Sequence, residues 1–140
     1  MVTIELVEGS AVDLVKVVDL YSSVGWGVYT RDPEKLGRAL AGSASVAIAL
    51  DGEKLVGLAR VVSDGASIAY LQDVLVNPAA QRAGLGRRLV EKVLEPYGDV
   101  RQKVLLTDDE PGQRAFYQSL GFSETRDFGE GTLRAFVRFD

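Results

Sequence analysis

The sequence predicts a mixed α/β (α+β) fold in a single domain that spans residues 1–140. Two observations support this class: some segments alternate apolar and polar residues with a period of two, and others repeat apolar residues every three or four positions. The length of 140 residues is enough for one hydrophobic core. The expected element order is β-α-α-β-β-β-α-β-α-β-β, with a mixed central sheet of about six to seven strands and about four helices.

Both periods occur in the first third of the chain. Residues 4–6 alternate as in a short strand, and residues 10–13 are a variant of the capping box that precedes apolar positions at helical spacing. Residues 22–30 form a glycine-containing loop that carries aromatic side chains. A second helix is expected to begin at Asp32, which is followed by a proline, and to end at Gly42.

Three strands are predicted in the middle of the chain. Segments 45–50, 53–62 and 68–76 are rich in β-branched and other apolar residues, as buried strands are. Asp-Gly pairs at 51–52 and 64–65 separate these segments, and such pairs are typical of tight turns. We therefore expect short connections between consecutive strands.

Helices and strands alternate in the last part of the chain. Apolar residues at helical spacing predict an amphipathic helix at 84–94 and a further helix between Pro111 and Gly121, with a short buried strand at 104–106 between them. Two final strands are predicted at residues 123–128 and 133–139. In the second of these, apolar residues occupy alternate positions on one face.

The composition excludes several kinds of site and partner. The sequence has no cysteine and no histidine, which removes disulfides, thiolate zinc sites, cysteine nucleophiles and histidine-based triads. No metal is expected. A net charge of −4 argues against a nucleic-acid partner. No apolar run approaches the roughly 20 residues that span a bilayer, and the N-terminus lacks a signal-peptide pattern, so we expect a cytoplasmic protein with no membrane partner.

A glycine-rich turn between the third middle strand and the next helix predicts a pyrophosphate-binding site. Its residues are Gln81-Arg82-Ala83-Gly84-Leu85-Gly86. Glycines let the backbone approach a ligand closely, the helix N-terminus carries partial positive charge, and Arg82 can add charge-assisted hydrogen bonds. The plain alternative is a glycine-rich connection. Two other phosphate motifs do not fit, because Gly-Lys-Ser/Thr is absent and Leu89 stands where the dinucleotide motif needs a third glycine.

Three segments together resemble the GCN5-related N-acetyltransferases, the GNAT superfamily. They are Leu71-Gln72-Asp73-Val74-Leu75-Val76-Asn77-Pro78, the turn at 81–86, and Phe116-Tyr117-Gln118-Ser119-Leu120-Gly121-Phe122. The resemblance implies a GNAT-type acyl-CoA N-acyltransferase fold with acetyl-CoA as co-substrate, bound where two parallel strands splay apart. It also implies direct transfer of the acetyl group to a primary amine of a small molecule, peptide or protein, through a tetrahedral intermediate.

The resemblance assigns cofactor contacts and one catalytic residue. It implies a bulge at the end of the fourth strand, where backbone groups of Val74, Leu75 and Val76 bind the pantetheine arm and polarise the thioester carbonyl. These apolar side chains can at the same time pack in a central strand. Tyr117 matches the tyrosine that contacts the cofactor and protonates the leaving CoA thiolate. Its alternative role is a packed helix residue.

Two departures from the family pattern bear on the base. Relatives often carry a glutamate at the position of Leu105 and an asparagine at the position of Glu110. Asp73 is the first candidate for the general base or for an anchor of the substrate ammonium group, because a carboxylate within a sheet needs a partner or a function. It can instead be a satisfied hydrogen-bonding residue. The acidic run 108–110 is a second candidate, and one of its members is expected to cap the following helix.

The acceptor side and the rival functions stay open in the sequence. Trp26 and Tyr29 lie where the family forms one wall of the acceptor pocket, and they suit an aryl, alkyl or cationic amine or, alternatively, a hydrophobic plug. A homodimer is possible through the C-terminal arginines and Phe136. Transfer of a longer acyl group and a non-catalytic acetyl-CoA sensor are the alternative functions, and only turnover separates an enzyme from a sensor.

Overall fold

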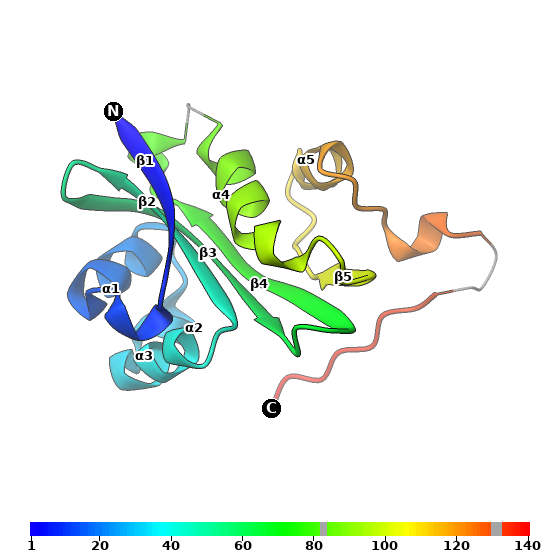
Figure 1. Ribbon diagram of the computed structural model, residues 1–140, viewed down its shortest axis with the longest axis horizontal. Helices are drawn as coiled ribbons and strands as arrows, with labels where there is room; N and C mark the ends of the chain where they lie inside the picture. Colours follow the sequence, from blue (N-terminus) through cyan, green and yellow to red (C-terminus); the bar gives the residue numbers. More distant parts are fainter. Residues whose placement is uncertain (82–83, 130–132) are drawn as a thin grey trace. The chain divides into compact units, whose positions relative to one another are not determined.

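The computed structural model describes residues 1–81, 84–129 and 133–140, which divide into two compact units, 1–106 and 107–140. The first unit contains a five-stranded sheet in the order β1-β2-β3-β4-β5 (Figure 1). Its strands are β1 (Val2–Val7), β2 (Ser45–Asp51), β3 (Lys54–Ser63), β4 (Ile68–Val76) and β5 (Gln102–Leu105). The first four pair antiparallel, and β5 runs parallel to β4. The mixed α/β class is therefore confirmed.

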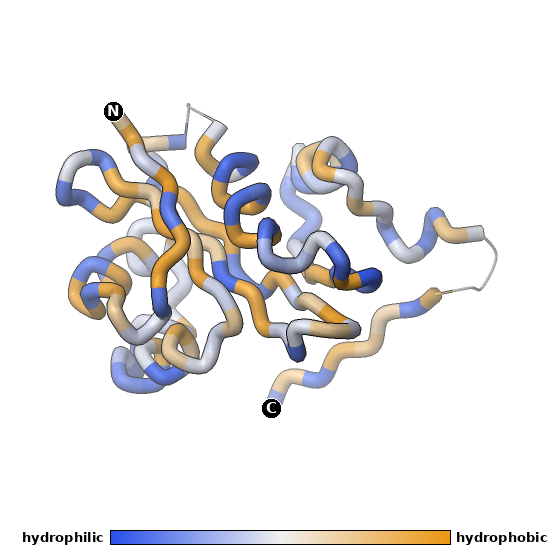
Figure 2. Tube along the Cα trace, viewed as in Figure 1, coloured by the Kyte–Doolittle hydropathy of each residue, from blue (hydrophilic) through white to orange (hydrophobic). Residues whose placement is uncertain are grey.

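Three helices pack on one face of this sheet and α4 packs on the other (Figure 1). The first group is α1 (Leu14–Ser23), α2 (Gly27–Thr30) and α3 (Pro33–Ala41). Asp32 caps α3, as predicted. Helix α1 is capped by Asp13, whose carboxylate accepts from Val15 N and Lys16 N, so the capping box predicted at residues 10–13, with Ser10 as the cap, is wrong. The short helix α2 lies inside the segment predicted to be a loop. Figure 2 shows the apolar residues concentrated in the strands and on the helix sides that face them.

Helix α4 (Leu85–Leu94) makes the crossover from β4 to β5 that a parallel pair requires. Gly57 in β3 lets it approach the sheet closely, because a Cβ at this position would lie 2.8 Å from Cδ1 of Leu89. The buried face of α4 is Leu85, Leu89, Val90 and Val93, so the predicted helix at 84–94 is amphipathic as expected. Short 3-10 turns complete this unit: η1 (Gly9–Ala11), η2 (Pro78–Ala80) and η3 (Glu95–Tyr97).

The second unit contains α5 (Gln113–Ser119) and the 3-10 turn η4 (Thr125–Asp127). The two strands predicted at 123–128 and 133–139 are not found in the described residues, so the prediction of six to seven strands is wrong for this part of the chain. Alternation specifies which side chains share a face but supplies no partner for the backbone N–H and C=O groups. Around residue 125 those groups bond locally instead, as from Asp127 N to Glu124 O at 2.9 Å.

Across residues 1–81, 84–129 and 133–140, none of the helices has both the length and the apolar character needed to cross a bilayer.

Candidate functional site

Strand β4 extends beyond its parallel neighbour. It pairs with β3 as far as Val76, opposite Gly57, but with β5 only as far as Leu71, opposite Leu105. Within the described residues, the backbone of 72–76 therefore has no strand beside it on the β5 side. The open side of β4 lies where the family resemblance places the cofactor, although β5 ends at Leu105 rather than diverging from β4 as a strand.

The residues of β4 that are predicted to contact the cofactor can do so through backbone groups, because their side chains are wholly or partly buried. Leu75 and Val76 are 3% and 8% exposed, and Leu75 belongs to the core cluster that packs against α1 and α3. Val74 is half-buried. Both roles considered for these residues are thus compatible, since the side chains pack while backbone groups face the open side of β4.

A β-bulge lies in β4, before the predicted position. Arg60 pairs with Asp73 and Val61 pairs with Leu71, so Gln72 is the additional residue. Residues 74–76 pair in regular register with β3. The prediction of a bulge in this strand is confirmed, but its expected place at 74–76 is wrong. The cause is the cross-strand pairing of Arg60 with Asp73, which sets the register on that side.

In the described part of the glycine-rich turn, the groups that can contact a ligand belong to the backbone. Gly84 has φ 66° and ψ 26°, in the left-handed region, and directly precedes α4. A Cβ on Gly84 would meet no atom within 4 Å, so its surroundings are open. Leu85 is 1% exposed and packs in the core. Gln81 donates its side-chain amide to the carbonyl oxygen of Val76 at 3.1 Å, which ties the turn to the end of β4.

Two predicted turn residues, Arg82 and Ala83, lie outside the described residues. Helix α4 has no side-chain N-cap, and its first backbone bond to the turn runs from Arg88 N to Gly84 O at 3.2 Å. An α-helix leaves its first N–H groups without intrahelical acceptors, and here these include Leu85 and Gly86. Such groups, with the helix dipole behind them, suit a phosphate.

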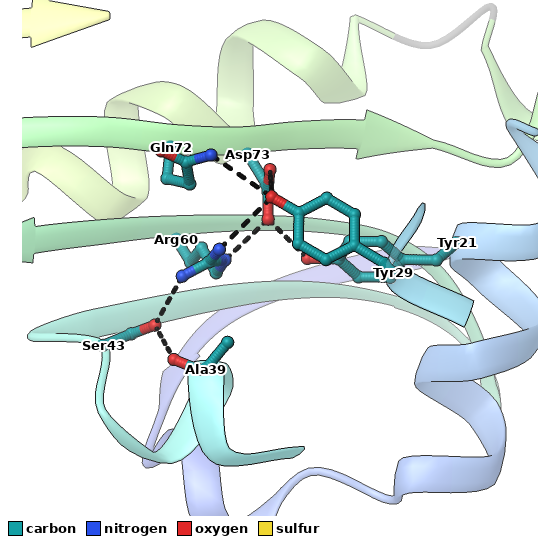
Figure 3. Close-up of polar contacts among 7 residues, drawn as sticks. All are labelled: Tyr21, Tyr29, Ala39, Ser43, Arg60, Gln72 and Asp73. Atoms are coloured by element: carbon teal, nitrogen blue, oxygen red, sulfur yellow. Dashed lines mark hydrogen bonds and ion pairs between the residues drawn. The ribbon is translucent and has the colours of Figure 1, made fainter. Parts of the chain in front are cut away.

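Asp73 lies in a buried polar cluster (Figure 3). Asp73 and Arg60 are 4% and 6% exposed, and Arg60 Nε lies 2.6 Å from Asp73 Oδ2. Tyr21 Oη donates to Oδ2 at 2.9 Å, and Tyr29 Oη donates to Oδ1 at 2.8 Å. We call Tyr21, Tyr29, Arg60, Gln72 and Asp73 the Asp73 cluster. The carboxylate thus receives three hydrogen bonds from three elements of the first unit.

Tyr29 joins the Asp73 cluster to the predicted acceptor wall. Its hydroxyl oxygen accepts from Gln72 Nε2 at 3.2 Å and from Arg60 Nη2 at 3.4 Å. The ring centroids of Trp26 and Tyr29 are 6.2 Å apart, and Tyr21 lies 5.9 Å and 5.0 Å from them respectively. Trp26 and Tyr29 are both half-buried. The structure therefore brings together all three residues predicted to bind the acceptor: Trp26, Tyr29 and Asp73.

Burial governs the ionisation of this cluster. It raises the pKa of Tyr21 and Tyr29, and the charge of Asp73 raises both further. Burial lowers the pKa of Arg60, but the adjacent carboxylate and its hydrogen bond raise it by more, so the net shift is upward. At neutral pH the phenols are therefore neutral and the guanidinium is charged.

Tyr117 belongs to the second unit. It lies in α5, half-buried, with Phe116 and Phe122 at ring-centroid distances of 4.9 Å and 6.1 Å. Burial, and then the charge of Asp108, raise its pKa above the ordinary value. A phenol that holds its proton at neutral pH is suited to donate it to a thiolate.

The two residues that depart from the family pattern, Leu105 and Glu110, are not part of the Asp73 cluster. Leu105 ends β5 and is half-buried, and Glu110 is exposed. Asp108 Oδ1 accepts from Glu110 N at 3.1 Å and from Gln113 Nε2 at 3.3 Å. Asp108 thus bonds within the loop ahead of the helix. Gly112 is the N-cap of α5 and no side chain caps this helix, so the expectation that a member of the acidic run caps it is wrong.

Three members of the Asp73 cluster were not anticipated from the sequence: Tyr21, Arg60 and Gln72. A signal for Arg60 was present, since it is the single charged residue in the otherwise apolar run 55–62. A buried charge requires an opposite charge, and Asp73 in the next strand supplies one. Tyr21 has the spacing of a core helix position, and nothing local distinguishes its hydroxyl.

Comparison with known proteins gives a family match, a curated relative and a solved structure of similar fold and sequence. Residues 16–139 match the family described as "Acetyltransferase (GNAT) domain". A curated relative, the histone acetyltransferase TAP1 of Glycine max, is 34% identical over 127 residues, which cover 81% of this chain and 53% of the relative. A solved structure of a GNAT family acetyltransferase from Streptococcus pneumoniae TIGR4 has 33% identity and a TM-score of 0.85, over 100% of this chain and 98% of that chain.

A further solved structure is the aminoglycoside N-acetyltransferase AAC(6')-Iy in complex with CoA. Its TM-score is 0.73 over 100% of this chain and 95% of that chain, but at 17% identity the likeness shows the fold alone. The chain spans about half the length of the curated plant relatives that it matches. The family match and the structural match at 33% identity extend over most of the chain. The chain belongs to the GNAT family of acetyltransferases.

Proposed function

We propose that this protein transfers the acetyl group of acetyl-CoA directly to a primary amine of a small molecule, peptide or protein. The observation that carries the proposal is the open side of β4 beyond Leu71, together with Gln81, which is bonded to the end of β4, and the N-terminus of α4 at Leu85. An extended backbone followed by the N–H groups at a helix N-terminus matches a long ligand with an amide-rich arm and a pyrophosphate.

The residues present fit acetyl-CoA in kind. When bound, it supplies an acetyl thioester, whose carbonyl carbon accepts the amine while the carbon–sulfur bond breaks. In our proposal, backbone groups of residues 74–76 hold the arm and polarise the carbonyl. Gln81, Gly84, Leu85 and Gly86 hold the pyrophosphate through the turn and the start of the helix, and Arg82 and Ala83 join them.

Tyr117 is the proposed proton donor to the CoA sulfur. Its raised pKa keeps the phenol protonated at neutral pH, so it has a proton to give as the thiolate leaves. A thiol has an ordinary pKa of about 8.5, so the thiolate is a weaker base than the phenolate and the proton transfer itself is uphill. The amine loses its own proton to a base. Asp73, the predicted base and ammonium anchor, is held by three donors.

The acceptor is proposed only as a class. One relative is a histone acetyltransferase and one structural neighbour is an aminoglycoside N-acetyltransferase, so amines of proteins and of small molecules are both represented around this chain. Trp26 and Tyr29 place half-buried aromatic faces near the bulge of β4. Aromatic faces bind apolar and cationic groups alike.

A non-catalytic acetyl-CoA sensor is the second candidate. Leu105 and Glu110 favour it, because they stand where relatives carry a glutamate and an asparagine. Tyr117 counts against it, since a sensor has no use for a proton donor at the thiolate. A transferase of a longer acyl group is the third, because the same backbone groups bind CoA whatever its acyl tail.

Other features of the assembly stay predictions. We propose that the two units, 1–106 and 107–140, act as one domain, which is supported by a family match that spans both. A homodimer through the C-terminal segment is supported by exposed apolar side chains there, such as Phe136, which is 88% exposed. A cytoplasmic location, and the expectation of no nucleic-acid, membrane or metal partner, stay predictions.

The test is release of free CoA thiol from acetyl-CoA in the presence of aryl-alkyl amines, polyamines, aminoglycosides, amino acids and short peptides. Amine-dependent release supports the transferase. Tight acetyl-CoA binding by calorimetry without release across the panel supports the sensor. Absence of acetyl-CoA binding contradicts both. Repeating the assay with succinyl-CoA tests the preference for a longer acyl group.

A further inference from the structure

The carboxylate of Asp73 has little capacity left for a substrate. It is 4% exposed and already accepts from Tyr21, Tyr29 and Arg60. An ionised carboxylate offers about four lone-pair sites, so one site at most is open. The positive charge of Arg60 at 2.6 Å also cancels the attraction that Asp73 would exert on a substrate ammonium group.

The hydroxyl of Tyr29 is held from three sides. It donates its proton to Asp73 and accepts from Gln72 and Arg60. Arg60 also lies over the ring of Tyr29, with its Cζ 5.8 Å from the ring centroid. Among the described residues, no buried side-chain polar atom lacks a hydrogen-bond partner. The cluster is thus satisfied without a substrate, and the orientation of the Tyr29 ring follows from it.

The β-bulge explains how neighbouring residues serve one cluster. Normally Gln72 and Asp73 would point to opposite faces of β4, yet both reach the Tyr29 hydroxyl. The additional residue at Gln72 re-aims the strand locally, as bulges do beside functional sites. Arg60, opposite Asp73 in β3, further binds Ser43 Oγ at 3.4 Å, just beyond the C-terminus of α3.

We infer that Arg60 and Asp73 are positioning residues, which fix Tyr29 and its neighbour Trp26 as the aromatic wall of the acceptor site, and that Asp73 does not accept the proton of the amine. This inference rests on the proposed function. The proton of the attacking amine then leaves to water. The wall presents ring faces and an ion pair of zero net charge, so acceptor binding at this wall depends on apolar and π contacts rather than on a carboxylate.

The first test removes the two charges one after the other. Asp73→Asn leaves the guanidinium of Arg60 buried without its anion, and Arg60→Met added to it removes that charge. For positioning residues we expect kcat/KM to fall by about 100-fold in the single variant and to recover about 10-fold in the double variant. A base cannot be restored by removing its neighbour, so a double variant as inactive as Asp73→Asn overturns the inference.

The second test uses the pH profile of kcat/KM to separate a base from a positioning residue, and the acceptor KM to separate a positioning role from a merely structural one. If Asp73 is the base, Asp73→Asn abolishes the acidic limb of the profile. If it positions Tyr29, the acidic limb stays where it is in the wild type. Tyr29→Phe, which removes only the oriented hydroxyl, is expected to raise the acceptor KM by about 2- to 10-fold with kcat nearly unchanged. A change confined to kcat would contradict the assignment.

The third test needs no turnover, and so separates this inference from the proposed function. Trp26 is the only tryptophan in the sequence, and its emission reports on the loop beside Tyr29. We expect Asp73→Asn and Tyr29→Phe to increase acrylamide quenching of Trp26, while Asp64→Asn leaves it unchanged. Asp64 is a matched control, because its carboxylate is also held by local hydrogen bonds, but in an exposed turn. Unchanged quenching in both cluster variants overturns the inference even if the wild type transfers no acetyl group.

Discussion

Asp73 in β4 and Asp108 ahead of α5 are both acidic residues predicted near the reacting groups, and their surroundings differ. Asp73 is buried and accepts hydrogen bonds from two phenols and a guanidinium. Asp108 is exposed and accepts from Glu110 N and the side chain of Gln113. A buried carboxylate persists only with a full set of partners, which then hold it in one geometry. An exposed one keeps its water and can exchange protons.

Arg60→Met tests whether buried Asp73 depends on its cation, and it has the largest expected effect. The substitution leaves the Asp73 carboxylate buried without its cation, and we expect it to lower the free energy of unfolding by about 3–5 kcal/mol. Urea denaturation followed by circular dichroism measures this. The double variant Arg60→Met/Asp73→Asn is the matched control and should recover most of the loss. A loss in Arg60→Met below about 1 kcal/mol, as for an exposed pair, would mean that the site is more open to water than its burial indicates.

Tyr117→Phe tests the second unit. Phenylalanine keeps the packing against Phe116 and Phe122 but has no proton to give, so we expect kcat to fall by about 100- to 1,000-fold with acetyl-CoA affinity nearly unchanged. Because the pKa of Tyr117 is raised above 10.0, wild-type kcat should hold as pH rises and decline only when pH passes the raised pKa. That decline should be missing in the variant. Equal kcat in the two proteins would assign the proton transfer to another group.

Gly84→Ala tests the glycine turn with a smaller effect. Gly84 has φ 66°, where an L-side chain costs about 1–2 kcal/mol, so we expect acetyl-CoA to bind roughly 5- to 10-fold more weakly by calorimetry. Gly98→Ala is the matched control, because Gly98 has φ −57° and equally open surroundings. Equal affinities for the two variants would indicate that the turn does not approach the ligand.

Asp108→Ala has the smallest expected effect. It removes one local acceptor, so we expect a loss of about 0.5–1 kcal/mol in the free energy of unfolding. The charge of Asp108 raises the pKa of Tyr117, so in this variant the phenol of Tyr117 should titrate at a lower pH than in the wild type. The difference in ultraviolet titration between Asp108→Ala proteins with and without Tyr117→Phe isolates that phenol. Asp109→Ala serves as control, and an unchanged Tyr117 titration in Asp108→Ala would show that the two groups are not coupled.

The sequence predicted those elements whose signal is local. The period of the apolar residues located α4 and the strands β2, β3 and β4 within a few residues, and the Asp-Pro pair at 32–33 located the start of α3. The short helix α2 was missed because one helical turn is too short to show a period. The final strands were predicted from alternation alone, which gives the face of a residue and not its partner.

Individual residues of the site could be predicted from the sequence, but their hydrogen-bond partners could not. Asp73 was identified because a lone carboxylate in an apolar strand is conspicuous, yet its partners come from α1, α2 and β3. Which hydroxyl meets which carboxylate depends on packing between these elements, and on the register of β3 against β4. The displaced bulge has the same origin, since Gln72 is additional only relative to the strand beside it.

The central claim is transfer of acetyl groups from acetyl-CoA to an amine, and the most direct measurement follows both products at once. Acetyl-CoA labelled in its acetyl group would be incubated with the protein and the amine panel, and the CoA thiol released would be compared with the label found on acceptor nitrogen. We predict equal amounts of the two products, dependence on the amine, and a large loss of both in Tyr117→Phe. Thiol release without label on any amine, or no consumption of acetyl-CoA by a protein that binds it, would contradict the account.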